Sequence, residues 1–208
     1  LEAVLEDYFG NQTLGAGLIH TLITSYDIQN RRPVFFKSWR EDHRSVRMKD
    51  AARATSAAPT YFEPAQVSVG GVTRALIDGG VFINSPCVSA YAEAKKIFPD
   101  EKDFFVLSLG TGEQIRPIAF DEAAGWGKAG WLVPLLSCMF DGAADAAHYQ
   151  MNMFLGDRYV RMQTTLAAAS DDMDNATDGN VENLKAEAEN LIQAHKADIE
   201  TVCALDMA

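Results

Sequence analysis

The chain has 208 residues and a formal net charge of −11, from 18 Lys and Arg residues against 29 Asp and Glu residues. Hydrophobic residues make up 48% of it and charged residues 23%, which excludes a disordered chain and predicts a sizeable core. The acidic balance argues against nucleic-acid binding, which depends on Lys and Arg side chains to neutralise phosphates. The most apolar stretch, residues 131–140, is far shorter than the ~20 residues that a membrane-spanning helix needs.

The amino-terminal half alternates between helical and strand patterns. Two helices are predicted, over residues 1–8 and 45–58, the first ended by Gly10-Asn11 and the second by Pro59. Four strands are predicted in two pairs: residues 18–26 with 34–36, and residues 66–69 with 72–77. The second pair encloses Gly70-Gly71, which is a strong signal for a β-hairpin.

The carboxy-terminal half has the same mixed character. Ser85 followed by Pro86 is typical of a helix start, and that helix is expected to reach about Ile97. The other predicted elements are a buried parallel strand over 104–109, mostly helical chain over 126–155, a strand over 159–165, an acidic loop over 167–180 and a helix over 181–202. This alternation predicts an α/β fold, and without a repeat or a linker residues 1–208 are expected to form a single domain.

Cysteine and histidine usage gives no sign of a metal or a disulfide framework. The three cysteines are Cys87, Cys138 and Cys203, an odd and widely spaced set without a CxxC pair. The four histidines show neither HxxxH nor HExxH spacing. We therefore expect no metal site, and the free thiols fit a reducing compartment.

The first candidate for chemistry is Asp78, which ends an apolar run and is followed by Gly79 and Gly80. Ligand sites in open α/β sheets lie outside the carboxyl ends of strands. Apolar neighbours should raise the pKa of a carboxyl there, so that it could act as a general base. The alternative is an ordinary Asp-Gly turn at the end of a strand.

The second candidate is the glycine-rich turn Gly110-Thr111-Gly112, which follows the apolar residues 106–109. Its backbone amides could hold a phosphate. The turn lacks the lysine of GxxxxGK[ST] and the spacing of GxGxxG, so a nucleotide site is weakly supported. A structural turn at a strand end is the alternative.

Three other features are best explained by structure. The small residues within 51–62 favour close packing of elements, and Ser56 among them has no recognisable base beside it. Eight basic against three acidic residues between Arg31 and Arg53 could face anionic lipid, but a solvated and internally paired surface is the expectation. An apolar group could line a lipid-facing surface or an acyl pocket, with core packing as the default: Trp126, Trp131, Leu135, Met139 and Phe140.

Several of these stretches occur in a characteristic order. They are Thr24–Asp27 with Pro33–Phe36, Ala54–Phe62, Asp78–Gly80 with Asn84–Pro86, Leu107–Gly112, and Tyr159–Gln163 with residues 172–192. In this order they resemble the patatin-like phospholipase family over nearly the whole chain. The resemblance is more specific than any single stretch, and it favours a functional role for Asp78.

The resemblance implies a three-layer α/β/α sandwich and a Ser–Asp dyad that hydrolyses acyl esters of phospholipids and related lipids, with no metal or cofactor. Asp78 matches the family's catalytic aspartate and would be the general base. The supporting residues are Gly79 and Gly80, and the implied cleft wall is Gly110, Thr111 and Gly112. The implied partners are an acyl-ester lipid and, transiently, a membrane surface, for a protein of the cytoplasm.

The sequence departs from the family in one respect: it contains no Gly-x-Ser-x-Gly. In the family that motif and the oxyanion loop precede the region that matches Leu1. We therefore expect the carboxy-terminal part of a catalytic domain, inactive alone and dependent on a missing amino-terminal half or another chain. The alternatives are a non-catalytic, partner-binding protein that keeps the fold, and a phosphate or nucleotide binder that uses Asp78 and the Gly110–Gly112 turn.

Overall fold

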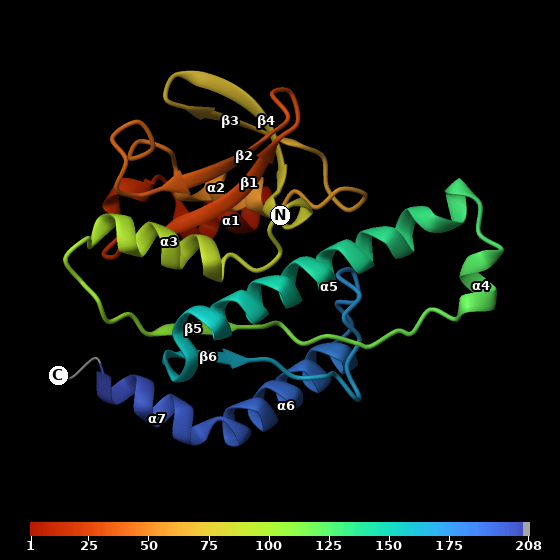
Figure 1. The fold of residues 1–208 in the computed structure, drawn as a ribbon. Coiled ribbons are helices and arrows are strands. Elements are labelled where there is room, and N and C mark those ends of the chain that lie inside the picture. The colour runs from red at the N-terminus through yellow and green to blue at the C-terminus, as the bar shows by residue number, and fades with distance from the viewer. Residues whose placement is uncertain (206–208) are drawn as a thin grey trace. The chain divides into compact units, whose positions relative to one another are not determined.

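A computed structural model describes residues 1–205 (Figure 1). Its contacts divide the chain into two compact units. The first unit consists of Leu1–Ala94 and Leu132–Ala147, and the second of Lys95–Trp131 and the chain from His148 onward. Compact units of this kind can belong to one domain, so the single domain expected from the sequence stays a prediction.

The first unit contains a four-stranded antiparallel sheet with the strand order β2-β1-β4-β3 (Figure 1). Its strands are β1 (Leu22–Asp27), β2 (Arg32–Lys37), β3 (Ala65–Val69) and β4 (Val72–Asp78). Both predicted strand pairs are confirmed. The first strand begins at Leu22 rather than at Leu18, because Leu18 and Ile19 are exposed and contribute to no strand.

One face of this sheet forms the core of the unit. Residues alternate between the two faces of a strand, so Ala65, Val67 and Val69 of β3 are buried while Gln66 and Ser68 are exposed. Helix α1 (Glu2–Phe9) contacts helix α2 (Met48–Thr55), which is shorter than the predicted helix over 45–58 and packs on the sheet. The core contains two fully buried alanines of α2 and two large strand residues: Ala51, Ala54, Phe36 and Leu76. Burial of each large side chain contributes roughly 1.5–3 kcal/mol.

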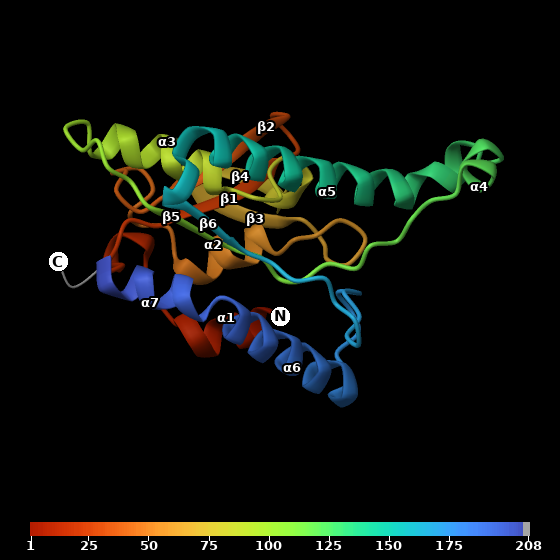
Figure 2. The ribbon, with the colours of Figure 1, turned by 60° about the horizontal axis from the view of Figure 1, so that its bottom comes forward.

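The opposite face of the sheet carries helix α3 (Cys87–Ile97) (Figure 2). The Lys37 Nζ atom of β2 lies 2.7 Å from Glu93 Oε1 of this helix. Phe35 points to the same face and makes an edge-on contact with Phe82, with ring centroids 5.7 Å apart. Helices thus cover both faces of the sheet, and the α/β class is confirmed.

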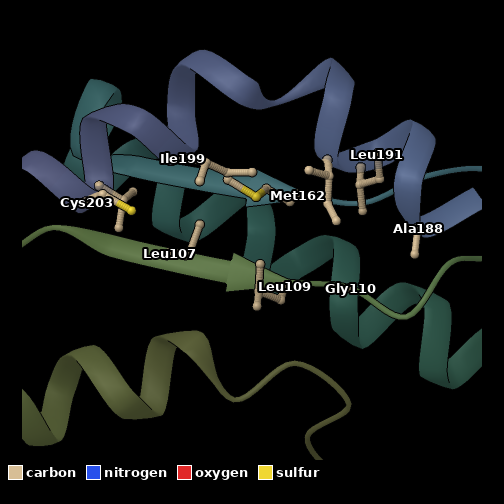
Figure 3. Close-up of a pocket in the computed structure, with 10 residues that line it drawn as sticks. Leu107, Leu109, Gly110, Met162, Ala188, Leu191, Ile199 and Cys203 are labelled. Carbon is tan, nitrogen blue, oxygen red and sulfur yellow. The ribbon is translucent and has the colours of Figure 1, made fainter. Parts of the chain in front are cut away.

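In the second unit a short parallel strand pair joins β5 (Val106–Leu109) to β6 (Tyr159–Met162). The strand over 104–109 was predicted to be parallel, and this is confirmed for Val106–Leu109. Its predicted burial is wrong, because Leu109 at the end of β5 (Figure 3) is 67% exposed and only Ser108 of β5 is buried. The predicted strand over 159–165 ends at Met162, beyond which an isolated bridge joins Thr165 to Glu113.

Long helices account for most of the remaining chain. The short helix α4 (Phe120–Ala124) precedes α5 (Lys128–Leu155), which continues through Pro134 and Gly142 without a break. A single carboxy-terminal helix was predicted, but there are two, α6 (Asp178–Ala194) and α7 (Lys196–Leu205). They are separated at His195, whose Nδ1 atom lies 2.7 Å from Asp198 Oδ2 in the first turn of α7. Among the residues that are described, no helix has both the length and the apolar character needed to cross a bilayer.

Candidate active site

Asp78 is the last residue of β4, as the sequence predicted, and it begins the short 3-10 turn η2 (Gly79–Val81). Its partner across the antiparallel pairing is Ser25 of β1. Its backbone N–H donates to the carbonyl oxygen of Ala57 at 3.0 Å, in the chain that follows α2. The main chain at Asp78 is therefore held from two sides, and its carboxylate leaves the sheet at the strand end.

The carboxylate of Asp78 is half-buried and has one hydrogen bond in the described chain. The N–H of Gly80 donates to Oδ1 at 2.7 Å, and no cation forms an ion pair with either oxygen among residues 1–205. Burial raises the pKa of the Asp78 carboxyl above its ordinary value, and the Gly80 hydrogen bond opposes that rise. The raised pKa expected from the sequence is confirmed, and Oδ2 stays available as a proton acceptor.

The two glycines after Asp78 meet different requirements. A Cβ atom at Gly79 would lie 2.3 Å from Thr24 Oγ1 and 2.6 Å from the Thr24 carbonyl carbon, which leaves no room for any side chain. A Cβ atom at Gly80 would lie 3.2 Å from Asp78 Oδ1, close to the oxygen that its own amide binds. The close approach of β1 thus requires Gly79, and Gly80 places its N–H against the carboxylate.

Small residues after α2 allow this part of the unit to pack tightly. Ala54 and Ala57 are fully buried, and Ala57 supplies the carbonyl that binds the amide of Asp78. Ser56 donates to the Ala52 carbonyl at 2.7 Å, which leaves the hydroxyl engaged in its own helix. The structural interpretation of this segment is confirmed.

Ser25 is the serine nearest to Asp78 in the strand register, but its hydroxyl is engaged elsewhere. The side chain is fully buried, and Oγ donates to the carbonyl oxygen of Ile77 at 2.6 Å. A hydroxyl that is excluded from solvent and bound to a backbone carbonyl cannot attack a substrate. Ser25 is therefore a structural residue of the β1–β4 pair.

The Gly110–Gly112 turn of the second unit continues the pairing of β5 with β6. The Gly110 N–H donates to the Met162 carbonyl at 2.8 Å, and the Gly112 N–H donates to Gln163 Oε1 at 2.9 Å. Gly112 has a positive φ of 86°, a conformation that favours glycine. Because these two amides already bind protein oxygens, they are not free to hold a phosphate. The turn is structural, which weakens the phosphate-binding alternative.

The structure brings Asp78, Gly79 and Gly80 together, with Thr24 and Ala57 as supports that the sequence analysis did not identify. Thr24 and Ala57 act through close approach and a backbone carbonyl, for which no sequence signal exists. Asp78 belongs to the first unit and the Gly110–Gly112 turn to the second, so a cleft formed by both stays a prediction. Within residues 1–205, no group of three or more His, Cys, Asp or Glu residues is arranged to hold a metal ion.

The basic segment is internally paired, as expected. Five of its cations lie against carboxylates, in the pairs Lys37–Glu93, Arg40–Asp42, Arg47–Asp50, Lys49–Glu6 and Arg53–Glu2. The apolar group of five differs in part from the expectation of core packing: Trp131, Leu135 and Met139 are exposed, whereas Trp126 and Phe140 are partly buried. Trp126 and Trp131 contact each other edge-on, with ring centroids 5.1 Å apart.

Comparisons with known proteins extend the resemblance noted in the sequence. Residues 1–91, which include Asp78, match the family model described as patatin-like phospholipase. Three proteins of Arabidopsis thaliana align with most of the chain: patatin-like protein 1 (30% identical over 92% of the chain), patatin-like protein 6 (30% over 95%) and patatin-like protein 8 (32% over 89%). The chain spans 54%, 44% and 38% of their respective lengths, about half or less. The resemblance is thus confirmed: residues 1–91 match the family model, and most of the chain is similar to proteins named patatin-like.

Proposed function

We propose that this chain is part of a lipid acyl hydrolase in which Asp78 is the general base. The nucleophile would be a serine outside residues 1–208, because these residues contain no Gly-x-Ser-x-Gly and Ser25 is sequestered. The substrate would be an acyl ester of a phospholipid or a related lipid, met at a membrane surface. Relationship to patatin-like phospholipases supports the reaction class.

The observation that carries the proposal is the state of the Asp78 carboxylate. A half-buried carboxylate without a cation is unfavourable for folding, since burial removes water that the charge would otherwise bind. Structural aspartates of this kind are normally paired, as Asp27 is with Arg74 at 3.0 Å. An unpaired carboxylate at a strand end, held by a glycine amide, is the arrangement expected of a base that must accept a proton.

The proposed reaction uses Oδ2 of Asp78, because Oδ1 already accepts the hydrogen bond from Gly80. The serine hydroxyl would transfer its proton to Asp78 Oδ2 while Oγ bonds to the ester carbonyl carbon. Collapse of the tetrahedral intermediate breaks the ester bond, and the leaving alcohol takes the proton back from Asp78. Water then attacks the acyl-enzyme with Asp78 again accepting a proton, and the serine regains its proton as the fatty acid leaves. The Gly80 N–H holds Oδ1 throughout, so that Oδ2 keeps its direction.

The test is the Asp78→Asn substitution in a longer protein that also contains the residues encoded upstream of Leu1. The amide has nearly the same shape but cannot accept the proton, so turnover of a chromogenic acyl ester should fall by about 10³-fold or more. Asp7→Asn is the matched control, since Asp7 is an exposed carboxylate of the same unit and should keep full activity. Near-native turnover in a folded Asp78→Asn variant would disprove the proposed role.

A further inference from the structure

Of the four histidines, all of which lie within residues 1–205, only His43 is buried, with 8% of its surface exposed. It belongs to the segment 38–47 that connects β2 to α2. Its Nδ1 atom accepts a hydrogen bond from the backbone N–H of Lys37 at 3.1 Å. A ring nitrogen that accepts a hydrogen bond carries no proton, so this contact requires a neutral His43 with its proton on Nε2.

The hydrogen bond closes a position at the edge of the four-stranded sheet. Strand β2 is an outer strand in the described chain, so its outward N–H groups lie at the open edge of the sheet. The N–H of Ser38 donates to the Thr21 carbonyl at 3.0 Å, on the side of β1, and the N–H of Lys37, one residue earlier, points outward. The ring of His43 thus binds an N–H that a further strand would otherwise have to satisfy.

The second half of the segment 38–47 is attached to the core. The Arg44 carbonyl accepts from the Gly15 N–H at 3.0 Å, and the Val46 carbonyl accepts from the Leu14 N–H at 2.8 Å. Leu14 and Val46 are both buried core residues. The segment is therefore fixed at its end by the core, and the ring of His43 fixes its middle to the sheet edge.

The charges that face His43 disfavour its protonated form. Burial lowers the pKa of His43 below its ordinary value, Asp42 opposes the decrease, and Arg40, Lys37 and Arg74 add to it. Asp42 Oδ2 lies 3.7 Å from Nε2, beyond hydrogen-bond distance, and both Asp42 oxygens accept hydrogen bonds from Arg40. Those bonds lower the pKa of Asp42 to about 2, so Asp42 stays charged while His43 titrates.

Protonation of His43 removes the acceptor on which this arrangement depends. Nδ1 of an imidazolium carries a hydrogen that would point at the Lys37 N–H, and the added charge would face three other cations. We propose that His43 is a proton-operated latch, which holds the segment 38–47 against the sheet edge when neutral and releases it when protonated. The latch is separate from the proposed hydrolysis, because the contacts on which it depends do not involve Asp78.

The direction of the pH dependence follows from the lowered pKa of His43. The stability that the neutral ring contributes is fully present above the unfolded pKa of about 6.5. It decreases as the pH falls below that value and is lost below the folded pKa. The segment should therefore be closed at about pH 7.5 and open more often at about pH 5.

The first test measures hydrogen exchange of backbone amides in the 208-residue chain, by mass spectrometry of peptides that cover residues 37–47. Protection factors, which correct for the intrinsic pH dependence of exchange, should be several-fold lower at about pH 5 than at about pH 7.5. Peptides from β1, a central strand of the same sheet, should change less. Unchanged protection of residues 37–47, or an equal loss in β1, would contradict a local latch.

Three substitutions separate the latch from other effects of pH. His43→Asn keeps an acceptor oxygen near the position of Nδ1 that cannot be protonated, so protection should stay high at both pH values. His43→Leu has no acceptor, so protection should be low at both. His20→Asn is the matched control, because His20 contacts Trp39 of the same segment with ring centroids 5.4 Å apart. Wild-type pH dependence that survives in His43→Asn, or disappears in His20→Asn, would overturn the proposal.

A second measurement needs no substitution, and it decides the matter if the variants do not fold. Heteronuclear NMR of the histidine rings distinguishes a ring nitrogen that carries a proton from one that does not. At about pH 7.5 His43 should have an unprotonated Nδ1, and it should titrate below about pH 6.5 as the protection of residues 37–47 falls. A proton on Nδ1 at neutral pH, or titration above that range, would refute the latch.

Discussion

Two aspartates of the four-stranded sheet have pKa values shifted in opposite directions, and the difference separates a candidate base from a structural residue. Asp78 has a raised pKa because it is buried without a cation. Burial also raises the pKa of Asp27, but hydrogen bonds from Asn30, Arg74 and Gln29 lower it by more. The pKa of Asp27 is therefore below its ordinary value. The first carboxylate is the proposed base, and the second holds the β1–β2 turn.

The raised pKa of Asp78 gives a prediction about stability. A carboxyl whose pKa is higher in the folded than in the unfolded state binds its proton more tightly when folded. The stability it contributes is thus present below the unfolded pKa of about 4 and is lost as pH rises through the folded pKa. Asp78→Asn should therefore increase the free energy of unfolding at pH 7, by an amount on the order of 1 kcal/mol. The gain should vanish at low pH, as urea titrations at both pH values would show.

Asp27→Asn should have the opposite effect. The lowered pKa of Asp27 means that its stabilising contribution is present above about pH 4 and is lost as pH falls through the folded pKa. At pH 7 the substitution should reduce the free energy of unfolding by about 1–3 kcal/mol, since Arg74 loses its carboxylate. If urea titration at pH 7 showed that both substitutions change the free energy of unfolding in the same direction, the opposite roles of Asp27 and Asp78 would be wrong.

At the scale of elements, the β4 strand end depends on the absence of a side chain at Gly79. Gly79→Ala would place a Cβ atom against the Thr24 backbone, so β1 and β4 must separate and the free energy of unfolding should fall by about 1–3 kcal/mol. Gly142→Ala is the control, because nothing lies within 4 Å of a Cβ there and alanine favours the helix. Denaturant titration of both variants should show a lower free energy of unfolding only for Gly79→Ala. An unchanged free energy of unfolding in Gly79→Ala would mean that the close approach to Thr24 is not needed.

Helices and strands are predicted well from the sequence where neighbouring residues follow a regular pattern of polar and apolar side chains. Alternation in β3 and the Gly70-Gly71 turn were sufficient for a hairpin, and the strand end at Asp78 followed from an apolar run. The break at His195 was missed because the apolar periodicity continues across it. The supports of Asp78 were missed for another reason: Thr24 and Ala57 are distant in sequence and act through backbone atoms, which no residue pattern reports.

At the scale of the whole molecule, the described chain exposes many large apolar residues. Phe120 is 83% exposed, Ile115 is 74% exposed and Leu132 is 65% exposed. Such residues mark a site of association only where they form a contiguous patch, because single exposed apolar residues are normal on folded proteins. The net charge of −11 disfavours association with a strongly anionic surface.

Residues 1–208 as a separate protein should be inactive. Asp78 is the proposed base, but these residues provide neither a Gly-x-Ser-x-Gly nor, at Ser25, a hydroxyl that could serve in its place. Loss of oxyanion donors alone commonly reduces the rate by about 10²–10³-fold, and loss of a nucleophile would reduce it further. We therefore expect no measurable hydrolysis of a chromogenic acyl ester, and self-association through the exposed apolar residues in light scattering. A stable monomer with Asp78-dependent esterase activity would show that these residues contain a nucleophile of their own, and the assignment of the serine to another segment would have to be abandoned.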